Sequence, residues 1–479
     1  MLQKTLYLFV FLLISLQLLS QENNGIIHSN YSPTNSVLIN PSSIGDSKVF
    51  WEINLIGSSF FLDNNYLFSP DFSIISAIRN PESVHEPLDN FKPGNKFAYT
   101  DFALHGPSFY LNLGKHAIGI TTQLRTVVDV RNMDANFAKL LFEGFDYLPQ
   151  RGIKYKTSNT KINAMSWGEL GFSYAYTFKQ KSYNQYIGGI SVKRLYGITH
   201  MGANIKNASF AVPDTSNIDI WNIDAKYGFS APSFNAGRGW SADLGFTYKK
   251  TLKQVDRYIP YSKNNDCIKS NYLYKIGLSL LDLGAISFKT NSYYGEIRDE
   301  GTWKDYNNSN FNDDYDQYHN KIIDGFANTS NLKDSYLAYL PTALAVQYDY
   351  NFQNGFYING SLLQNLSFFN QLGIKRQNLL AIAPRLELPR FEVSIPLSLR
   401  RYNTPSFGLA FRIWNHLIVG SDRLGSILFK GDIYGTDIYF NIKIAKLYTN
   451  RCKTKPSKIK LIKYITNSCH YISNKKWKE

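Results

Sequence analysis

The chain has little of what usually identifies a fold. Only 3 of its 479 residues are cysteine, and no apolar run after residue 20 is long enough to cross a bilayer as a helix. The lack of such runs excludes a helical membrane protein. Three cysteines are too few for a disulfide scaffold, although Cys452 and Cys469 are spaced to form one bridge and would leave Cys267 odd. A metal site at Cys452, Cys469 and His470 has no CxxC pair to support it.

The first twenty residues have the composition of a secretory signal peptide. Lys4 supplies the positive n-region, residues 6–19 the apolar core, and Ser20 a small residue where a peptidase can cut. The alternative, an uncleaved anchor helix, would need a longer apolar stretch. No cysteine lies near the cleavage point to carry a lipid anchor. We therefore predict that residues 1–20 are a signal peptide and that the chain is exported.

Beyond the leader, segments of roughly ten residues alternate apolar and polar side chains, a pattern typical of transmembrane β-barrels. Only helices and closed barrels satisfy their backbone groups inside a membrane. We predict an all-β fold, a single antiparallel barrel of about 14 strands (12 to 16) over residues 48–447. Residues 21–47 form an N-terminal segment and candidate plug, and residues 448–479 form a basic periplasmic tail.

Aromatic content and charge agree with this interpretation. Phe, Trp and Tyr make up 15% of the residues, as expected for aromatic girdles at two membrane interfaces. The mean hydropathy of −0.28 fits a wall in which every second residue faces a wet lumen. Residues 446–479 contain ten basic and one acidic residue, so +9 of the net charge of +15 lies there. The barrel itself is only mildly basic.

Individual strands allow specific expectations. Trp51, Ile53, Leu55 and Gly57 should share one face. In the next clear hairpin, the members of one face are Leu170, Phe172, Tyr174, Tyr176 and Phe178, and those of the other are Glu169, Ser173 and Thr177. Lys193 and Arg194 are expected near a strand end, where charges reach water. Residues 114–116 should form a tight turn, residues 136–144 a short helix, and residues 292–335 an exposed loop.

The candidate site residues are basic and lie near the C-terminal end of the barrel: Arg385, Arg390, Arg400, Arg401 and Arg412. One interpretation is that they line the lumen and select anions. The other is that they lie at strand ends and pair with Glu387, Glu392 or lipid phosphates. Asn40 and Pro41 mark the candidate plug, because Pro41 cannot donate to a β-ladder.

Two further groups of residues suggest chemistry only weakly. Asp101, His105 and Ser108 resemble a hydrolase triad, but their spacing puts Ser108 on the opposite face unless Gly106 and Pro107 form a bulge. Asp313, Asp314 and Asp316 could bind calcium, but their spacing does not follow the twelve-residue calcium loop. We predict no catalytic centre, no metal site and no cofactor.

Several short stretches resemble a family of uncharacterised outer-membrane barrels that often precede an OmpA-like peptidoglycan-binding domain. The matching pieces include residues 40–42, 168–171, 188–193, 277–284 and 408–412. After Tyr448 only the short basic tail follows, which puts cell-wall anchoring by such a domain in doubt. The start at Asn40-Pro41 and the overall size are also similar to FadL-like channels and to PorP/SprF-like barrels of type IX secretion.

The resemblance implies a function in the outer membrane of a Gram-negative cell. We expect a channel or transporter for small or hydrophobic compounds; the alternative is a non-enzymatic component of a secretion, gliding or surface-assembly machinery. A third reading, an outer-membrane hydrolase, would need the triad that the spacing opposes. The expected partners are outer-membrane lipid and periplasmic or secretion-machinery proteins, with no nucleic acid.

Overall fold

The computed structural model describes residues 24–83, 86–144, 147–214, 216–260, 271–304, 319–320, 323–326, 328–367 and 372–447. The expected signal peptide, the three cysteines, His470, the three aspartates of the calcium hypothesis and the basic tail after Leu447 lie outside these residues.

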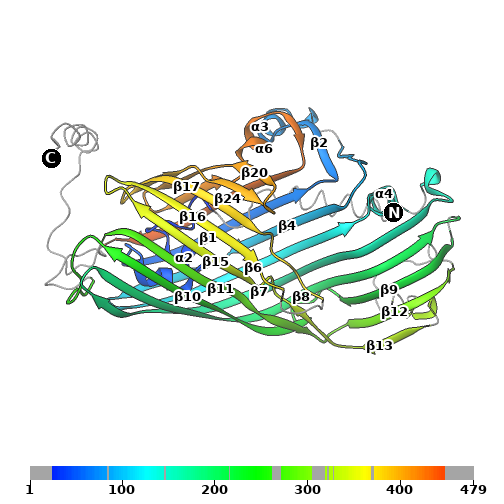
Figure 1. Cartoon of the computed structure of the whole chain (residues 1–479), viewed down its shortest axis with the longest axis horizontal. Helices are drawn as coiled ribbons and strands as arrows, with labels where there is room; N and C mark the ends of the chain where they lie inside the picture. Colours follow the sequence, from blue (N-terminus) through cyan, green and yellow to red (C-terminus); the bar gives the residue numbers. More distant parts are fainter. Residues whose placement is uncertain are drawn as a thin grey trace, which may run out of the picture.

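Within the described residues the chain forms one closed antiparallel β-barrel of 14 strands, which confirms the expected fold class (Figure 1). The barrel closes where β1 pairs with β24, from Trp51 opposite Lys446 to Asp63 opposite Gly435. Several strands of the wall are broken into two or three consecutive pieces, which share one place in the order. The first seven places are β1 (Trp51–Asn64); β4 (Lys96–His105) with β5 (Ser108–Leu113); β6 (His116–Met133); β7 (Lys154–Lys181); β8 (Asn184–Ala211); β9 (Ile218–Ser230) with β10 (Gly237–Thr251); and β11 (Tyr272–Phe288) with β12 (Ser292–Trp303). The last seven are β13 (Thr329–Lys333) with β14 (Tyr336–Tyr339) and β15 (Ala343–Asn351); β16 (Phe356–Asn365); β17 (Leu379–Glu387); β18 (Phe391–Ser394) with β19 (Leu397–Arg400); β20 (Thr404–Phe407) with β21 (Leu409–Ile413); β22 (Leu417–Ser421); and β24 (Gly435–Lys446).

Short helices and a small second sheet lie in the connections and ahead of β1. The expected helix after residue 135 is present as α4, and the Asp134 side chain caps it by accepting from the Asn136 and Phe137 N–H groups. No described helix is long and apolar enough to span a membrane. The helices are α2 (Pro33–Ser36), η1 (Pro41–Asp46), α3 (Ile74–Arg79), η2 (Pro81–Ser83), α4 (Ala135–Glu143), η3 (Leu148–Gln150) and α6 (Leu424–Leu428), and the small sheet contains β2 (Leu67–Phe72), β3 (Leu88–Asp89) and β23 (Gly431–Ile433).

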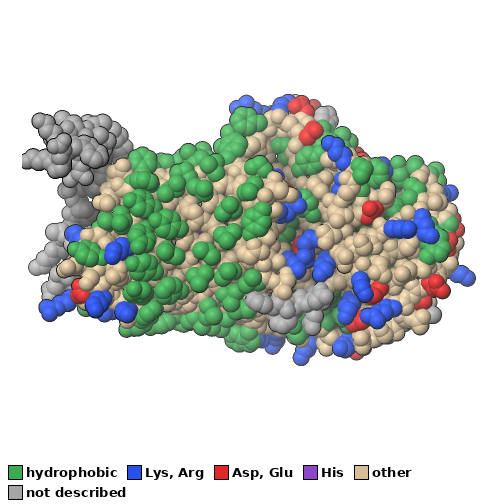
Figure 2. All heavy atoms as spheres, viewed as in Figure 1, with side chains coloured by type: hydrophobic (Ala, Val, Ile, Leu, Met, Phe, Trp, Pro, Cys, Tyr) green, Lys and Arg blue, Asp and Glu red, His purple; other side chains and the backbone are tan. Residues whose placement is uncertain are grey.

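The outer face of the wall carries a broad apolar belt. Figure 2 shows hydrophobic side chains over the half of the barrel nearer the start of β1 and the end of β24, with charged side chains gathered at both limits of this belt. On β7, Leu170 and Phe172 are 46% and 53% exposed, whereas Glu169 and Ser173 are buried. The two faces predicted for this strand are confirmed. Period-two alternation places apolar groups outside and polar groups inside.

We call the barrel end where β1 begins and β24 ends the lower end, and the opposite end the upper end. Aromatic rings mark the limit of the belt toward the lower end. Phe178, Tyr186, Tyr248, Tyr274 and Tyr348 come from five neighbouring strands, and their ring centroids follow each other at 6.3, 5.3, 6.1 and 6.0 Å. Along β8, Tyr186 and Tyr196 are ten residues apart. At about 3.4 Å per residue and a tilt of about 40°, this corresponds to roughly 26 Å of height, close to the apolar band of known barrels.

Two bulges set the faces in the first strands: one corrects an expected face, and the other is the bulge that the sequence left open at Gly106 and Pro107. The register shifts between Asn54 and Ile56, so Gly57 faces the lumen instead of sharing the outer face with Trp51 and Ile53. Gly106 and Pro107 separate β4 from β5, so Ser108 is buried on the inner side together with Asp101. A bulge adds one residue to one strand and therefore inverts every face after it.

The expectation of an exposed loop over residues 292–335 is wrong at both ends. Residues 292–303 form β12, which pairs with β9, and residues 329–333 form β13. With the upper parts of β7 and β8, these strands continue the wall well beyond the belt, at the right of Figure 1. Their inner side encloses an apolar cluster with α4 that includes Leu140, Tyr155 and Phe210. That burial stabilises the extension beyond the belt.

We predict that Phe172→Arg destabilises the barrel because it places a charge on the lipid-facing wall. The free energy of unfolding should fall by about 2–4 kcal/mol. The matched control is Ser158→Arg, an exposed position of the same strand beyond the belt, which should change it by less than about 0.5 kcal/mol. Denaturant titration in lipid vesicles measures both. Equal losses would contradict the placement of the belt.

Candidate functional site in the barrel lumen

Residues 24–48, here called the lumen segment, lie inside the barrel, and nearly all of them are buried. Short helical turns fold this segment locally. The Asn40 side chain accepts from the Ser42 N–H at 3.0 Å, and Pro41 occupies the first turn of η1, where no N–H is needed. Pro33 begins α2 in the same way. The segment therefore satisfies much of its backbone itself and presents side chains to the wall.

Two wall glycines allow η1 to approach the strands closely. A Cβ atom on Gly189 of β8 would lie 2.3 Å from the Ser42 nitrogen, and one on Gly245 of β10 would lie 2.3 Å from Asn40 Oδ1. Any larger residue at these inward-facing positions would displace the segment. The Ser42 hydroxyl then meets the Thr247 hydroxyl at 2.7 Å.

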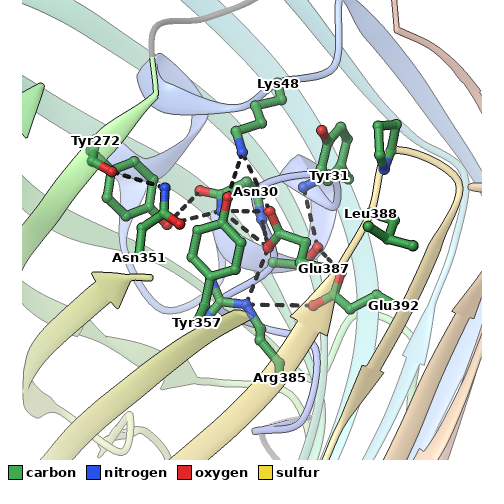
Figure 3. Close-up of polar contacts among 12 residues, drawn as sticks. Asn30, Tyr31, Lys48, Tyr272, Asn351, Tyr357, Arg385, Glu387, Leu388 and Glu392 are labelled. Carbon is green, nitrogen blue, oxygen red and sulfur yellow. Dashed lines mark hydrogen bonds and ion pairs between the residues drawn. The ribbon is translucent and has the colours of Figure 1, made fainter. Parts of the chain in front are cut away.

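The lower part of the lumen contains a network of ion pairs around Glu387 (Figure 3). Asn30 donates to the Glu387 carboxylate from its side chain at 2.7 Å and from its backbone N–H at 3.1 Å. Lys48 lies 3.6 Å from Glu387. Ser29 donates to Glu392 at 2.6 Å. The lumen segment is thus attached to β17 and β18 through carboxylates of the wall.

Arg385 connects this network to β15. Its guanidinium donates to both oxygens of Asp349, at 2.7 and 2.9 Å, and lies 3.1 Å from Glu387. Tyr272 of β11 donates to Asp349 as well. A bidentate arginine–carboxylate pair fixes geometry as well as charge. Four wall strands therefore contribute to one buried cluster.

Two lysines of the wall hold the lumen segment at other positions around the barrel. Lys443 of β24 donates to Ser32, Thr34 and Glu52 at 2.7, 3.0 and 3.0 Å. Lys249 of β10 donates to Asp46 at 2.5 Å. Contacts to strands on opposite sides of the wall fix the segment across the lumen.

Higher in the barrel, Asp282 is the centre of a second charge cluster. Arg376, Lys193 and Arg125 lie 2.7, 2.8 and 3.0 Å from its carboxylate. Asp282 has a positive φ of 52° at a bulge of β11, and its N–H donates to Asp243 at 2.7 Å. Such a conformation is uncommon for a residue with a side chain. It directs the carboxylate toward three cations from different parts of the barrel.

Arg376 belongs to a second segment that enters the lumen, residues 372–377. The backbone N–H of Gly373 donates to the Asn163 side chain of β7 at 3.3 Å, and the backbone N–H of Lys375 donates to the Asp129 carboxylate of β6 at 3.0 Å. Leu372 and Ile374 pack in an inward-facing apolar cluster that includes Trp167, Phe288 and Tyr336. A cavity of about 30 Å³ lies beside the lumen segment, next to His28 and Asn359.

The five candidate arginines fall in different places. Arg385, Arg400 and Arg412 are buried in the lumen. Arg412 pairs with Glu392 at 2.9 Å, and the Arg400 guanidinium lies 4.1 Å from the centre of the Phe61 ring and 3.8 Å from Asp437. Arg401 is partly exposed at the rim, 3.8 Å from Asp63. Arg390 is exposed in the turn between β17 and β18. Asn40 and Pro41 lie inside the barrel, in and just before η1.

The suggested triad is not assembled. Ser108 shares the inner side with Asp101 because of the bulge, but its hydroxyl donates to the Gly106 carbonyl at 3.1 Å. His105 contacts Ser59 at 3.2 Å, and Asp101 lies 3.7 Å from Arg125. No group of three or more His, Cys, Asp or Glu side chains within the described ranges is arranged to hold a metal ion.

Sequence reasoning missed several residues of the site. Lys193 was expected near water at a strand end, but it lies buried in the lumen, 2.8 Å from both Asp243 and Asp282. Asp282 and Lys443 were also missed. Each is a charged residue with apolar residues directly before and after it, and in a barrel strand that pattern indicates a lumen position with a partner elsewhere in the chain.

Comparison with known proteins gives one family and several solved barrels. The model of the Family of unknown function (DUF5723) matches residues 41–422. No curated protein matches the sequence. Similar solved structures are a TodX deltaS2S3 mutant monoaromatic hydrocarbon channel (9% identity, 86% of this chain and 94% of that one, TM-score 0.43), a Pseudomonas aeruginosa FadL homologue (11%, 90% and 98%, 0.39) and the Ralstonia pickettii toluene transporter TbuX (8%, 87% and 94%, 0.38).

We predict that Arg385→Met lowers the free energy of unfolding by about 3–5 kcal/mol, because it leaves the buried Asp349 and Glu387 carboxylates undercompensated. Arg390→Met, in the exposed turn of the same hairpin, should change it by less than about 0.5 kcal/mol. Urea titrations of the two variants in vesicles make the comparison. A small loss for Arg385→Met would show that the cluster is not closed to water.

Proposed function

The chain belongs to the Family of unknown function (DUF5723), and we propose that it is an outer-membrane channel for small, largely apolar compounds. In this proposal the lumen segment is a plug that closes the channel. The observation that carries the proposal is the way in which the lumen is closed. The lumen segment, which precedes β1 in the chain, fills the lumen. Its polar contacts with the wall are hydrogen bonds and ion pairs, which can break and form again.

The belt and the strand topology support the placement in an outer membrane. Apolar side chains cover the outer wall over a height of roughly 26 Å, between aromatic residues at both limits. Both ends of the wall, Trp51 and Lys446, lie at the same barrel end because the strand number is even. Most of the longer connections and the wall extension lie at the opposite end, which corresponds to the extracellular side of known barrels.

The chemistry of the contacts supports a movable plug. Lys443, Glu387 and Lys249 of the wall lose their partners in the segment if it moves, but water entering the lumen can hydrate them. Ile27, Ile39 and Ile44 of the segment also belong to apolar clusters with the wall, and those contacts have no such replacement. The polar part of the interface therefore adds little to the cost of moving the segment, since net hydrogen-bond contributions are only about 1 kcal/mol each.

The inner surface above the charge cluster around Asp282 supports the proposal of an apolar substrate. Trp167, Phe288 and Tyr336 face inward there, where a water-filled porin has polar residues. Residues 372–377 cross the same region and would have to shift with the plug. The substrate class follows from this lining and not from the charged network below it.

A second candidate function is a non-enzymatic part of a secretion or surface-assembly machinery. The observation that favours it is the extension formed by β7, β8, β9 and β12, which projects beyond the belt on one side only (Figure 1). Such a projection offers a protein-binding surface outside the membrane. In that case secretion-machinery or periplasmic proteins would be the partners, and the lumen would stay filled.

Planar-bilayer conductance distinguishes the two functions. Gly245→Leu places a side chain where Asn40 and Ser42 lie and should raise the open probability of the purified barrel at least tenfold, because a clash of about 1.4 kcal/mol suffices for that change. Gly168→Leu, where an added Cβ meets nothing within 4 Å, is the matched control and should leave the conductance unchanged.

A lock tests the same idea in the opposite direction. Cysteines in place of Ser42 and Thr247, whose hydroxyls lie 2.7 Å apart, should form a bridge and abolish conductance and the uptake of a small aromatic hydrocarbon. A reductant should restore both. Conductance that neither Gly245→Leu nor the bridge alters would overturn the plug, and a barrel that never conducts would favour the assembly function.

A further inference from the structure

Two arginines and two aromatic residues alternate on the outer face of the neighbouring strands β8 and β10, with like residues on diagonal positions. Arg194 is directly opposite Trp240, and Tyr196 is directly opposite Arg238. The Arg194 guanidinium lies 4.9 Å from the centre of the Trp240 ring and 5.8 Å from that of Tyr196. Trp240 is 60% exposed. We call these four residues the outer patch.

The outer patch has positive charge without a balancing acid. Arg194 donates to the Gly239 carbonyl at 3.3 Å, and Arg238 donates to the Asn235 side chain at 2.9 Å. Among the described residues, no acidic side chain forms an ion pair with either arginine or with the exposed Lys289 close by. Lys289 is near because its N–H donates to the Ala236 carbonyl at 3.0 Å. Like charges on diagonal positions of neighbouring strands repel each other, so an anion between them would stabilise the patch.

The position of the outer patch restricts what that anion can be. Tyr196 and Trp240 lie at the upper limit of the belt, at the barrel end opposite Trp51 and Lys446. Directly below them on the same two strands, Ile190, Val192 and Leu244 are exposed and apolar. A ligand that covers both surfaces has an anionic head group at the height of the rings and hydrocarbon chains below it.

We propose that the outer patch binds the phosphate of a phosphorylated glycolipid in the outer leaflet of the membrane. The Arg194 and Arg238 guanidiniums donate to the phosphate oxygens, because the planar fork of arginine matches phosphate geometry. Trp240 and Tyr196 pack against the sugar at the interface, and the acyl chains lie on Ile190, Val192 and Leu244. The inference rests on the proposed outer-membrane placement but not on channel activity.

The experiment compares three probes on the full mature chain in detergent: diphosphoryl lipid A, the same lipid with both phosphates removed, and inorganic phosphate alone. Native mass spectrometry counts bound lipid, and thermal unfolding reports stabilisation. Arg194→Gln combined with Arg238→Gln should weaken binding of the diphosphoryl lipid by about tenfold or more. Lys156→Gln combined with Lys206→Gln, two exposed cations of the extension, should leave binding unchanged.

Each outcome decides the assignment. Preference of the wild-type chain for the diphosphoryl lipid over the dephosphorylated one, lost in the arginine variant, supports it. Equal binding of both lipids, or binding that survives loss of both arginines, overturns it. Stabilisation by inorganic phosphate equal to that by the lipid would identify a simple anion site instead. Because Arg238 is exposed and its side chain donates to the exposed Asn235, Arg238→Gln alone is a second variant that should fold and still bind more weakly. Conductance is not measured, so this result is independent of the plug.

Discussion

Charge compensation among buried side chains is the constraint on which the rest of this structure depends. Residues 24–48 and 372–377 occupy the interior, and inward-facing charged side chains such as Glu387 and Asp282 are almost fully buried. An isolated ion in such surroundings costs several kcal/mol. The wall therefore places Glu387 beside Arg385 and Lys48, and Asp282 beside Arg125, Lys193 and Arg376. These pairs set the position of the lumen segment and tie strands that are distant in sequence.

Local periodicity was enough to predict much of the wall. The alternation of β7 identified its lipid face, the tight turn at residues 114–115 separates β5 from β6, and the short helix after Asp134 is α4. The first strand of the wall, β1, begins at Trp51 and the last, β24, ends at Lys446. All of these depend on interactions between near neighbours along the chain, which a single sequence contains directly.

The remaining features depend on contacts that periodicity does not contain. The bulges at residues 54–56 and 106–107 invert a face because of how neighbouring strands fit together. The face of Gly57 was therefore predicted wrongly, and the face of Ser108 depended on a bulge that the sequence allowed but did not decide. Lys193 was assigned to a strand end because its partners, Asp243 and Asp282, are far away in sequence. Residues 292–303 are polar and were expected to form a loop; their strand is stabilised by pairing with β9 beyond the apolar belt. The arrangement of the five arginines was beyond prediction for the same reason.

The attachment of the lumen segment has a consequence for the order of assembly. Hairpins such as β7 and β8 join residues close in sequence and can form early. Asn24 and Ser32, in contrast, bind Asp422 and Lys443, which lie about four hundred residues later in the chain. The segment therefore cannot be fixed until the last strands arrive, and by then β24 is closing against β1. Enclosure of the segment and closure of the cylinder must belong to one late step, so a nascent barrel whose N-terminal residues are held elsewhere would close around an unfilled interior.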